Sequence, residues 1–235
     1  VKRILETETH ARVYCTIRDF ETDYTPRSES LLSSGKNLEK ILTNPVYQIA
    51  DAGVALNLRW ILSNYIFSNK CNSKTRDENV VFTSFHADSL HSSASGLMVY
   101  IPGADYYRGN IRKKGKVYTR RKESKGQLSV SSSRSKRLKA EGYSKSLAMA
   151  IENECKEMKL KMHSDQPTRK FVIRKRRSWV PALLRYCKVP TRVLVELANL
   201  QNSSDVKKIK DSKFREKLAR MYVNALIKHY SVSKD

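Results

Sequence analysis

The apolar positions of this chain follow two kinds of pattern, short continuous runs and longer stretches with helical spacing. The short runs are rich in β-branched and aromatic residues, predict strands, and lie at 13–17, 80–85, 97–101 and 193–195. The longer stretches predict amphipathic helices and lie at 49–67, 143–162 and 204–230. Ser212 is the predicted N-cap of the last helix. Because strands alternate with helices, we expect an α/β fold with a twisted mixed sheet flanked by helices on both faces.

The length of 235 residues suits either one domain with an insertion or two domains. We expect the first arrangement, a single domain over 1–235 that carries an insertion at 103–142. This segment interrupts the pattern because it is rich in Gly, Ser, Lys and Arg and has almost no large aliphatic residues. Two structures are compatible with that composition: a twisted two-stranded ribbon with Gly115 near its turn, or a disordered loop.

Positive charge exceeds negative charge, with 46 Lys and Arg against 23 Asp and Glu and a formal net charge of +23. Such an excess usually indicates a polyanionic partner. Most of it lies in two segments, because residues 108–139 hold thirteen basic residues and one acidic residue, and residues 169–177 hold six basic residues and no acidic one. A nucleic-acid-binding module would need its charge spread over one face of the domain, so this confinement argues against nucleic acid as the partner.

Cysteine usage and hydropathy exclude two classes of protein. The cysteines lie far apart and form no C-x-x-C pair, so we expect buried or free thiols rather than a zinc knuckle or redox motif: Cys15, Cys71, Cys155 and Cys187. No apolar run reaches the length of about eighteen residues that a membrane-spanning helix needs. The opening VKRILETETH lacks the apolar segment of a signal peptide and reads as the tail of a helix, so we expect the natural protein to begin further upstream.

Two of the predicted strands are followed directly by side chains that suit hydrolytic chemistry. His86 follows the strand at 80–85, and Glu196 follows the strand at 193–195. Functional residues of α/β sheets gather at the carboxyl ends of strands. A neutral imidazole can bind Zn²⁺ beside an open position for water, and a neighbouring carboxylate can take a proton from that water and return it. On spacing alone, a structural hydrogen-bonding role for His86 and a solvated Glu196 remain alternatives.

Four motifs occur in order along the chain. They are VYCTIRD at 13–19, RWILSN at 59–64, FTSFHADS at 82–89 with SGLMVY at 95–100, and VLVELANLQNSSDVKKIKDSKFREKLA at 193–219. Together these motifs resemble those of the zinc-dependent N-acetylmuramoyl-L-alanine amidases of the amidase-3 family. The resemblance covers roughly residues 4–230, because the motifs follow the family's order from its first strand to its terminal helix.

The resemblance implies a peptidoglycan hydrolase that cuts the amide between N-acetylmuramic acid and the L-alanine of the stem peptide, in the periplasm or outside the cell. It implies that Zn²⁺ polarises the scissile carbonyl and that His86 is one of three protein ligands of the zinc. It also implies that Glu196 is the catalytic carboxylate, acting first as general base and then as general acid. Arg59 and Asn64 match the family's helix motif, and we expect them to serve the architecture near the site.

The chain also departs from the family pattern. The family's other two zinc ligands, a His and a Glu, belong to a Gly-His-Gly-Gly segment that does not occur before the strand at 13–17. His10 precedes that strand without a glycine pair, so it is not assigned as a ligand, and we expect an N-terminally truncated copy of the domain. Ala198 and Asn199 stand where the family has Gly-Phe, which changes the expected shape of the site.

Two alternatives to the amidase function remain: a catalytically inactive wall-binding protein of the same fold, and a basic nucleic-acid-binding module. The insertion at 103–142 has three interpretations: a solvated loop, a contact for anionic wall polymers, lipid headgroups or a protein activator, and a nucleic-acid contact. The last would use tyrosines that interleave with its cations, namely Tyr106, Tyr107 and Tyr118. We interpret His91 and His163 as surface residues, and His229 as a cation near the end of the last helix.

Overall fold

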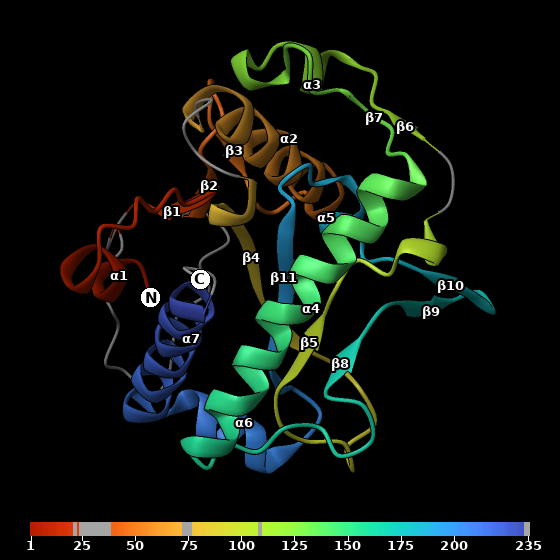
Figure 1. Cartoon of the computed structure of the whole chain (residues 1–235). Coiled ribbons are helices and arrows are strands. Elements are labelled where there is room, and N and C mark those ends of the chain that lie inside the picture. The colour runs from red at the N-terminus through yellow and green to blue at the C-terminus, as the bar shows by residue number, and fades with distance from the viewer. Residues whose placement is uncertain (21–22, 24–38, 72–76, 108–109, 233–235) are drawn as a thin grey trace.

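The central sheet of the molecule is mixed and has four strands. The computed structural model describes residues 1–20, 23, 39–71, 77–107 and 110–232, so Arg108 of the basic segment lies outside the described residues (Figure 1). The strand order is β4 (Val81–Asp88), β11 (Thr191–Asn199), β5 (Met98–Tyr100) and β8 (Thr168–Arg169). β11 pairs in parallel with β4 and antiparallel with β5, and β5 pairs in parallel with β8. The predicted mixed α/β architecture is therefore confirmed.

Helices and small sheets surround these four strands. The helices are α1 (Lys2–Glu8), α2 (Ala52–Lys70), α3 (Lys116–Thr119), α4 (Arg134–Glu157), α5 (Ala182–Tyr186), α6 (Ser203–Lys210) and α7 (Ser212–Val232). Short 3₁₀ turns lie at Asp77–Asn79, Ala104–Tyr106 and Lys122–Ser124. The small sheets are built from β1 (Ile17–Asp19), β2 (Glu39–Ile41) and β3 (Tyr47–Gln48), from β6 (Ile111–Arg112) and β7 (Ser129–Val130), and from β9 (Val172–Arg174) and β10 (Arg177–Trp179).

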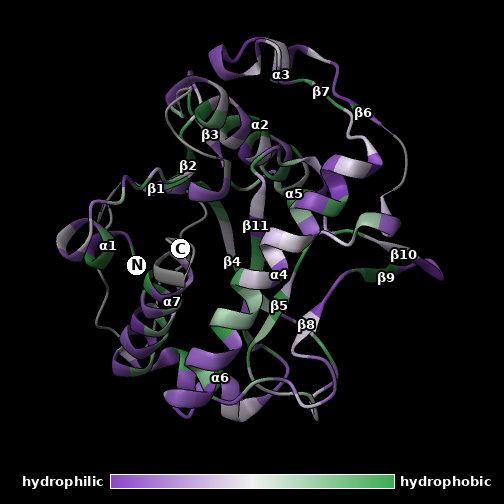
Figure 2. Cartoon of the chain, in the orientation of Figure 1, coloured by the Kyte–Doolittle hydropathy of each residue, from purple (hydrophilic) through white to green (hydrophobic). Residues whose placement is uncertain are grey.

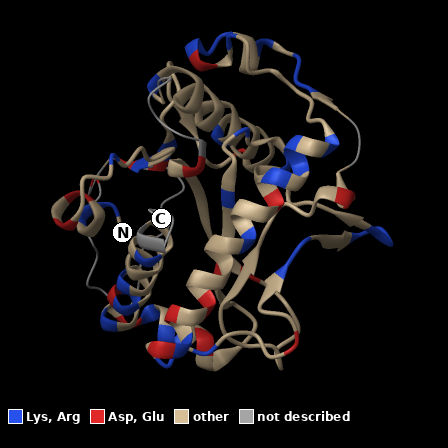
Figure 3. Ribbon diagram, viewed as in Figure 1, with Lys and Arg blue, Asp and Glu red and all other residues tan. Residues whose placement is uncertain are grey.

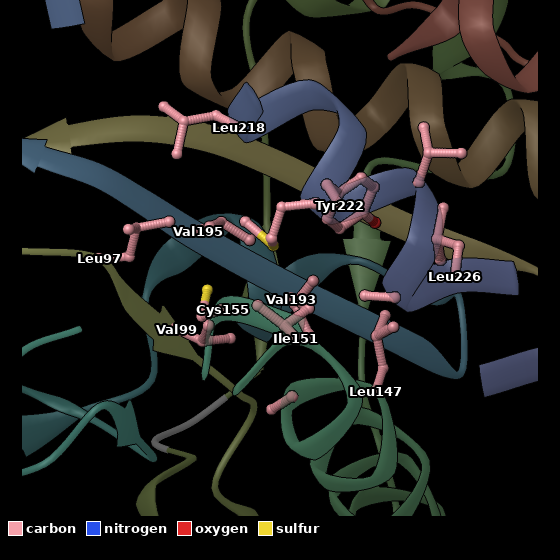
Figure 4. Close-up of a cluster of buried hydrophobic side chains, with 14 of the residues drawn as sticks. Leu97, Val99, Leu147, Ile151, Cys155, Val193, Val195, Leu218, Tyr222 and Leu226 are labelled. Carbon is pink, nitrogen blue, oxygen red and sulfur yellow. The ribbon is translucent and has the colours of Figure 1, made fainter. Parts of the chain in front are cut away.

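One face of the central sheet packs against α4 and α7. Figure 4 shows Val99, Val193 and Val195 of the sheet lying between Ile151 of α4 and Tyr222 of α7. All five side chains are buried. Because successive side chains of a strand point to opposite faces, the even-numbered positions of β4, β5 and β11 turn away from this core.

The opposite face of the sheet is covered by α5, with α2 packed beside α5. Met98, Tyr100 and Leu194 at even-numbered strand positions form a second buried cluster with Leu184 of α5. Figure 2 shows the hydrophobic residues gathered in the central strands and in the helices against them, whereas α6 is mostly hydrophilic. Helices therefore cover both faces of the sheet, as the alternation of patterns predicts.

Helix α4 begins at Arg134, inside the predicted insertion, and not at residue 143. Ser133 caps it, because the Ser133 hydroxyl accepts a hydrogen bond from the backbone N–H of Lys136 at 3.3 Å. The first turns consist of good helix formers without a buried apolar stripe, so hydrophobic periodicity could not reveal them. The helix also ends before residue 162, at Glu157, and Lys159 beyond it adopts a left-handed conformation with φ of 50°.

The ribbon predicted in the basic insertion is present as the short antiparallel pair of β6 and β7. Gly115 is not at its turn: it precedes α3 with φ of 104°, and α3 and a 3₁₀ turn lie between the two strands. Tyr118 is buried, and its hydroxyl accepts a hydrogen bond from Asn57 of α2 at 3.1 Å. Buried Glu123 accepts one from the backbone N–H of Asn44 at 2.9 Å. These described residues of the insertion are folded onto the body of the protein and are not a solvated loop.

The first strand lies further along the chain than the apolar run predicts. β1 spans Ile17–Asp19, because pairing with β2 begins only where Ile17 meets Ile41. Residues 13–16 have strand-forming side chains but lie outside the ladder between β1 and β2. A strand needs a hydrogen-bonding partner as well as a suitable composition.

The helical stretch near the C-terminus is divided into α6 and α7 at Asp211. The Asp211 carboxylate accepts a hydrogen bond from the backbone N–H of Lys213 at 2.9 Å, as an N-cap does. Asp211 is therefore the cap of α7, and the prediction of Ser212 as the cap is wrong by one position. The charged carboxylate of Asp211 is a stronger hydrogen-bond acceptor than the hydroxyl of Ser212.

Candidate functional site

Two central strands bring His86 and Glu196 side by side. Glu196 is the register partner of His86 in the parallel ladder between β4 and β11. Both residues occupy even-numbered positions, so they share the sheet face that lies opposite α4 and α7. The apolar runs predict that the two strands end just before these residues. In the structure, β4 continues to Asp88 and β11 continues to Asn199. A register shift between Glu196 and Asn199 interrupts the regular ladder immediately after the pair.

The His86 imidazole is half-buried and lies in hydrogen-bonding distance of one neighbouring side chain. Its Nε2 is 2.8 Å from the Oγ of Ser84, two positions earlier on the same face of β4. Burial lowers the pKa of His86, the Arg59 cation lowers it further, and the charge of Asp88 opposes both effects. The neutral imidazole is therefore favoured, which is the form that can act as a metal ligand or proton acceptor.

The Glu196 carboxyl group is buried and incompletely hydrogen-bonded. Its residue is 8% exposed, and its Oε2 has no hydrogen-bond partner among the described residues. Burial and the nearby negative charge of Asp88 together raise the pKa of Glu196 to about 7. A carboxyl group with that pKa can hold or release a proton near neutral pH, as a general acid–base group must.

Arg59 and Asp88 are the charged neighbours of this pair. Arg59 belongs to α2, and its Nε is buried without a partner among the described residues. Burial lowers the pKa of the Arg59 guanidinium. Asp88 lies two residues after His86 and therefore points to the same face of β4. The period-two spacing in His-Ala-Asp could have revealed Asp88 from the sequence, whereas the approach of Arg59 depends on how α2 packs.

Asn64 has the architectural role that its motif suggests. Its Nδ2 donates a hydrogen bond to the backbone oxygen of Tyr186 at 2.9 Å, and its Oδ1 accepts one from the backbone N–H of Lys188 at 2.7 Å. The side chain is fully buried. These two bonds connect α2 to the last residue of α5 and to the segment that follows it, and so hold the helix that carries Arg59 beside α5.

Asn199, one of the departures from the family pattern, organises the loop that follows β4. Its Nδ2 donates to the backbone oxygens of His91 and Ala94 at 2.9 and 2.8 Å, and its Oδ1 accepts from the N–H of Leu90 at 3.0 Å. The buried carboxylate of Asp205 accepts from the N–H of Asn199 at 3.0 Å. The loop after His86 is therefore fixed to the end of β11 by polar bonds. Sequence reasoning did not find this role, because it depends on contacts between distant segments.

A zinc site can be tested against the donor set of this face. The neutral imidazole of His86 fits Zn²⁺ in kind, but a catalytic zinc needs about three protein donors. The described residues contain no group of three or more His, Cys, Asp or Glu side chains placed to hold a metal ion. His10 is exposed just beyond α1. The described residues alone therefore do not make up a zinc site.

The remaining histidines and the cysteines have mostly structural surroundings. His91 is exposed, as expected, and its Nδ1 lies 2.8 Å from the hydroxyl of Ser93. His163 and His229 are half-buried, so the expectation of a surface His163 is wrong. Burial lowers the pKa of His229, which opposes the predicted cationic role at the end of α7. None of the four cysteines forms a disulfide, and two of them are buried: Cys155 and Cys187.

The fold and these residues define an α/β protein with a buried carboxyl group beside a neutral imidazole. The family model of N-acetylmuramoyl-L-alanine amidases, amidase-3, matches residues 29–228. The chain belongs to this amidase family. The predicted family is therefore confirmed, although a search of curated proteins finds no match.

Several solved structures are similar to the chain. The CwlD amidase from Clostridioides difficile, in complex with the GerS lipoprotein, is 20% identical over 76% of this chain and 64% of its own, with a TM-score of 0.45. Ami1 from Mycobacterium smegmatis is 14% identical over 81% of this chain and 80% of its own, with a TM-score of 0.43. The apo form of Ami1 from Mycobacterium abscessus is 13% identical over 91% and 94%, with a TM-score of 0.39. The chain thus spans less than two thirds of the CwlD amidase.

Proposed function

We propose that this chain hydrolyses the amide bond between N-acetylmuramic acid and the L-alanine of the peptidoglycan stem peptide. The observation that carries the proposal is the pairing of His86 with Glu196 on one sheet face of a member of the amidase family. Neighbouring strands are about 4.8 Å apart, so an imidazole and a carboxyl group at paired positions can act on the same substrate amide.

The two side chains take different roles in this reaction. Glu196 accepts a proton from the water that attacks the carbonyl carbon and then delivers it to the departing nitrogen of L-alanine. Its pKa of about 7 supports this role, because both protonation states are populated at neutral pH. His86 is proposed as one protein donor to Zn²⁺, and donors outside the described residues would have to complete that site, because the described residues hold no group of three donors. Arg59 supports that role by favouring the neutral imidazole.

The proposed substrate determines the expected location of the chain and its expected binding partners. Peptidoglycan lies outside the cytoplasmic membrane, so we propose a periplasmic or extracellular location in the cell envelope. Within the described residues, no helix is both long enough and apolar enough to cross a membrane. Contacts of the basic insertion with anionic wall polymers, lipid headgroups or a protein activator stay predictions.

Replacing the carboxyl group tests the proposal directly. The chain and its Glu196→Gln variant are incubated with purified wall and Zn²⁺, and the release of stem peptides with a free L-alanine amino group is measured. We expect the chain to release such peptides and the variant to be at least about 100-fold slower, because loss of general acid–base catalysis typically costs that much. Zinc bound per chain is measured on the same samples, as a readout independent of turnover.

A surface substitution of the same kind provides the control. Glu216 is exposed, pairs with Arg3, and belongs to α7, which packs on the other face of the sheet from His86 and Glu196, so Glu216→Gln should cut as fast as the unchanged chain. Equal rates for Glu196→Gln and the unchanged chain would rule out the assigned role. A chain that sediments with the wall but cuts nothing with zinc present would favour the inactive wall-binding alternative.

A further inference from the structure

A cavity of about 150 Å³ lies beside the amino-terminal end of α4. Its lining includes Tyr107 just after the 3₁₀ turn Ala104–Tyr106, Ser131 and Ser132 just before α4, Arg137 from α4 and Arg185 from α5. Figure 1 shows β6, β7 and α5 on the same side of the molecule as the amino-terminal end of α4. The cavity is large enough for several waters or for one small ion with part of its hydration shell.

Arg185 is held at this cavity with unused hydrogen-bond donors. Its Nη2 donates to the hydroxyl of Tyr186, but its Nε and Nη1 are buried without a partner among the described residues. Its guanidinium lies over the rings of Trp179 and Tyr186, with centroid distances of 5.0 and 4.5 Å. Buried donors without acceptors are costly, and an arginine fixed by two rings is already oriented for a ligand.

A second arginine reaches the cavity through Tyr107. Arg192 is only 4% exposed, and its guanidinium donates to the backbone oxygens of Leu184 and Val189. Its Nη2 also donates to the Tyr107 hydroxyl at 2.6 Å. Because that oxygen accepts from Arg192, the hydroxyl proton of Tyr107 is free to be donated to a group in the cavity.

The positive charge around the cavity is not balanced by its lining, which contains no carboxylate. Among the described residues, Arg137 bonds to neutral groups, the backbone oxygens of Ala104 and Ser132, at 3.0 and 2.7 Å. On the next turn of α4, Glu141 is already engaged by Lys170 at 2.6 Å. Burial lowers the pKa of Lys113, and the nearby Arg185 cation lowers it further, so a fourth basic residue lies close to Arg185, Arg192 and Arg137.

We propose that this cavity binds a phosphate group. Arginine guanidinium groups, a tyrosine hydroxyl and serine hydroxyls surround the space from three segments of the chain, which suits the several oxygens of a tetrahedral oxyanion. The cavity also lies beside the amino-terminal turn of the long helix α4, where the helix dipole favours negative charge. The phosphate can be free or part of a lipid headgroup, and the site does not depend on the amidase activity.

Calorimetric titration with inorganic phosphate at constant ionic strength tests this site. We expect the unchanged chain to bind one phosphate, and Arg185→Gln to bind at least about tenfold more weakly, because charge-assisted hydrogen bonds are lost. Tyr107→Phe keeps the ring and removes one donor, so it should weaken binding severalfold. Lys136→Gln is the matched control, because Lys136 is exposed next to Arg137 and does not line the cavity. Thermal unfolding without phosphate verifies that each variant is folded.

The same variants distinguish a specific phosphate site from nonspecific electrostatic attraction of phosphate to a basic surface. Equal losses in Lys136→Gln and Arg185→Gln, or no phosphate binding by the unchanged chain at millimolar concentration, would overturn the proposal. If Arg185→Gln does not fold, Tyr107→Phe decides the question alone. Competition by phosphatidylglycerol vesicles, and not by phosphatidylcholine vesicles, would assign the phosphate to an anionic lipid headgroup. Without such competition, the site is one for free phosphate.

Discussion

Glu196 carries an energetic cost in the folded protein that suits the proton transfer proposed for it. Its carboxyl group is buried beside Asp88 and lacks a full set of hydrogen bonds among the described residues. An ionised carboxylate is poorly solvated in such a place, so the fold favours the protonated form up to about pH 7. At the scale of the residue, the burial that suits Glu196 for the proposed proton transfer therefore also lowers the free energy of unfolding.

This cost predicts a pH-dependent gain in stability for Glu196→Gln. The folded pKa of about 7 lies above the unfolded value of 4.5, so the folded chain keeps a proton that the unfolded chain releases as pH rises from about 4.5 to 7. The free energy of unfolding should fall over that window in the unchanged chain. The variant lacks this fall and should be more stable by about 1–3 kcal/mol at pH 8. Denaturant unfolding with a chelator present measures the difference.

Near pH 4 the two proteins should be equally stable, because the carboxyl group is protonated in both the folded and the unfolded chain. The exposed Glu216→Gln serves again as the control for removing one carboxyl group elsewhere on the molecule. A constant difference between Glu196→Gln and the unchanged chain at all pH values would contradict the assigned environment.

The helices on the α4–α7 face are delimited by polar side chains as much as by their apolar stripes. Ser133 starts α4, and Asp211 separates α6 from α7. α4 and α7 are also joined by Glu154, which accepts a hydrogen bond from Asn224 at 2.8 Å and pairs with Lys228 at 2.6 Å. At the scale of elements, the apolar pattern shows that a helix exists, whereas caps and cross-links decide where it begins and what it contacts.

The cap of α7 can be identified by two neighbouring alanine substitutions. Asp211→Ala should lower the free energy of unfolding by about 1 kcal/mol, because the backbone N–H of Lys213 loses its acceptor. Ser212→Ala should change it by less than about 0.5 kcal/mol, since Ser212 is already the first helical residue. Thermal or denaturant unfolding measures both. The opposite order of the two effects would restore Ser212 as the cap.

Across the whole molecule, positive charge gathers in separate places and does not cover one face evenly. Figure 3 shows Lys and Arg concentrated on the amino-terminal half of α4 and at the tip of the hairpin formed by β9 and β10. At that tip, Lys175 and Arg176 adopt left-handed conformations with φ of 49° and 58°. Two-residue hairpin turns of this kind prefer Asn-Gly, so the chain places two cations where they are conformationally unfavourable.

Replacing the two cations at the hairpin tip by the preferred Asn-Gly turn tests whether their charge contributes to wall binding without lowering the stability of the protein. The double variant Lys175→Asn with Arg176→Gly should be at least as stable as the unchanged chain, because both new residues tolerate φ above zero. At about 50 mM salt, the double variant should bind purified wall severalfold more weakly than the unchanged chain. At about 500 mM salt, where surface charges are screened, the two should bind equally. Co-sedimentation with wall measures both conditions.

Removal of two exposed charges elsewhere controls for net charge. Lys207→Gln with Lys210→Gln on α6 makes the same change in net charge away from the hairpin and should leave wall binding nearly unchanged. Equal weakening by both double variants would show that net charge alone attracts the chain to the wall.

The sequence by itself determined the local character of this protein. Continuous runs of β-branched and aromatic residues predicted β4, β5 and β11, and helical spacing predicted most of α2, because both signals lie in residues at most four positions apart. The alternation of side chains along a strand places His86, Asp88 and Glu196 on the faces of their strands. Motif order also predicted the amidase family, which the match over residues 29–228 confirms.

Only the tertiary structure decided which of these local features meet. The pairing of His86 with Glu196 depends on the register of two strands that are separated by about a hundred residues of chain, and no local period encodes that register. The approach of Arg59 and the cavity around Arg185 likewise depend on helices packed from other parts of the chain. Secondary structure follows from neighbours along the chain, whereas burial, pKa and cavities follow from neighbours in space.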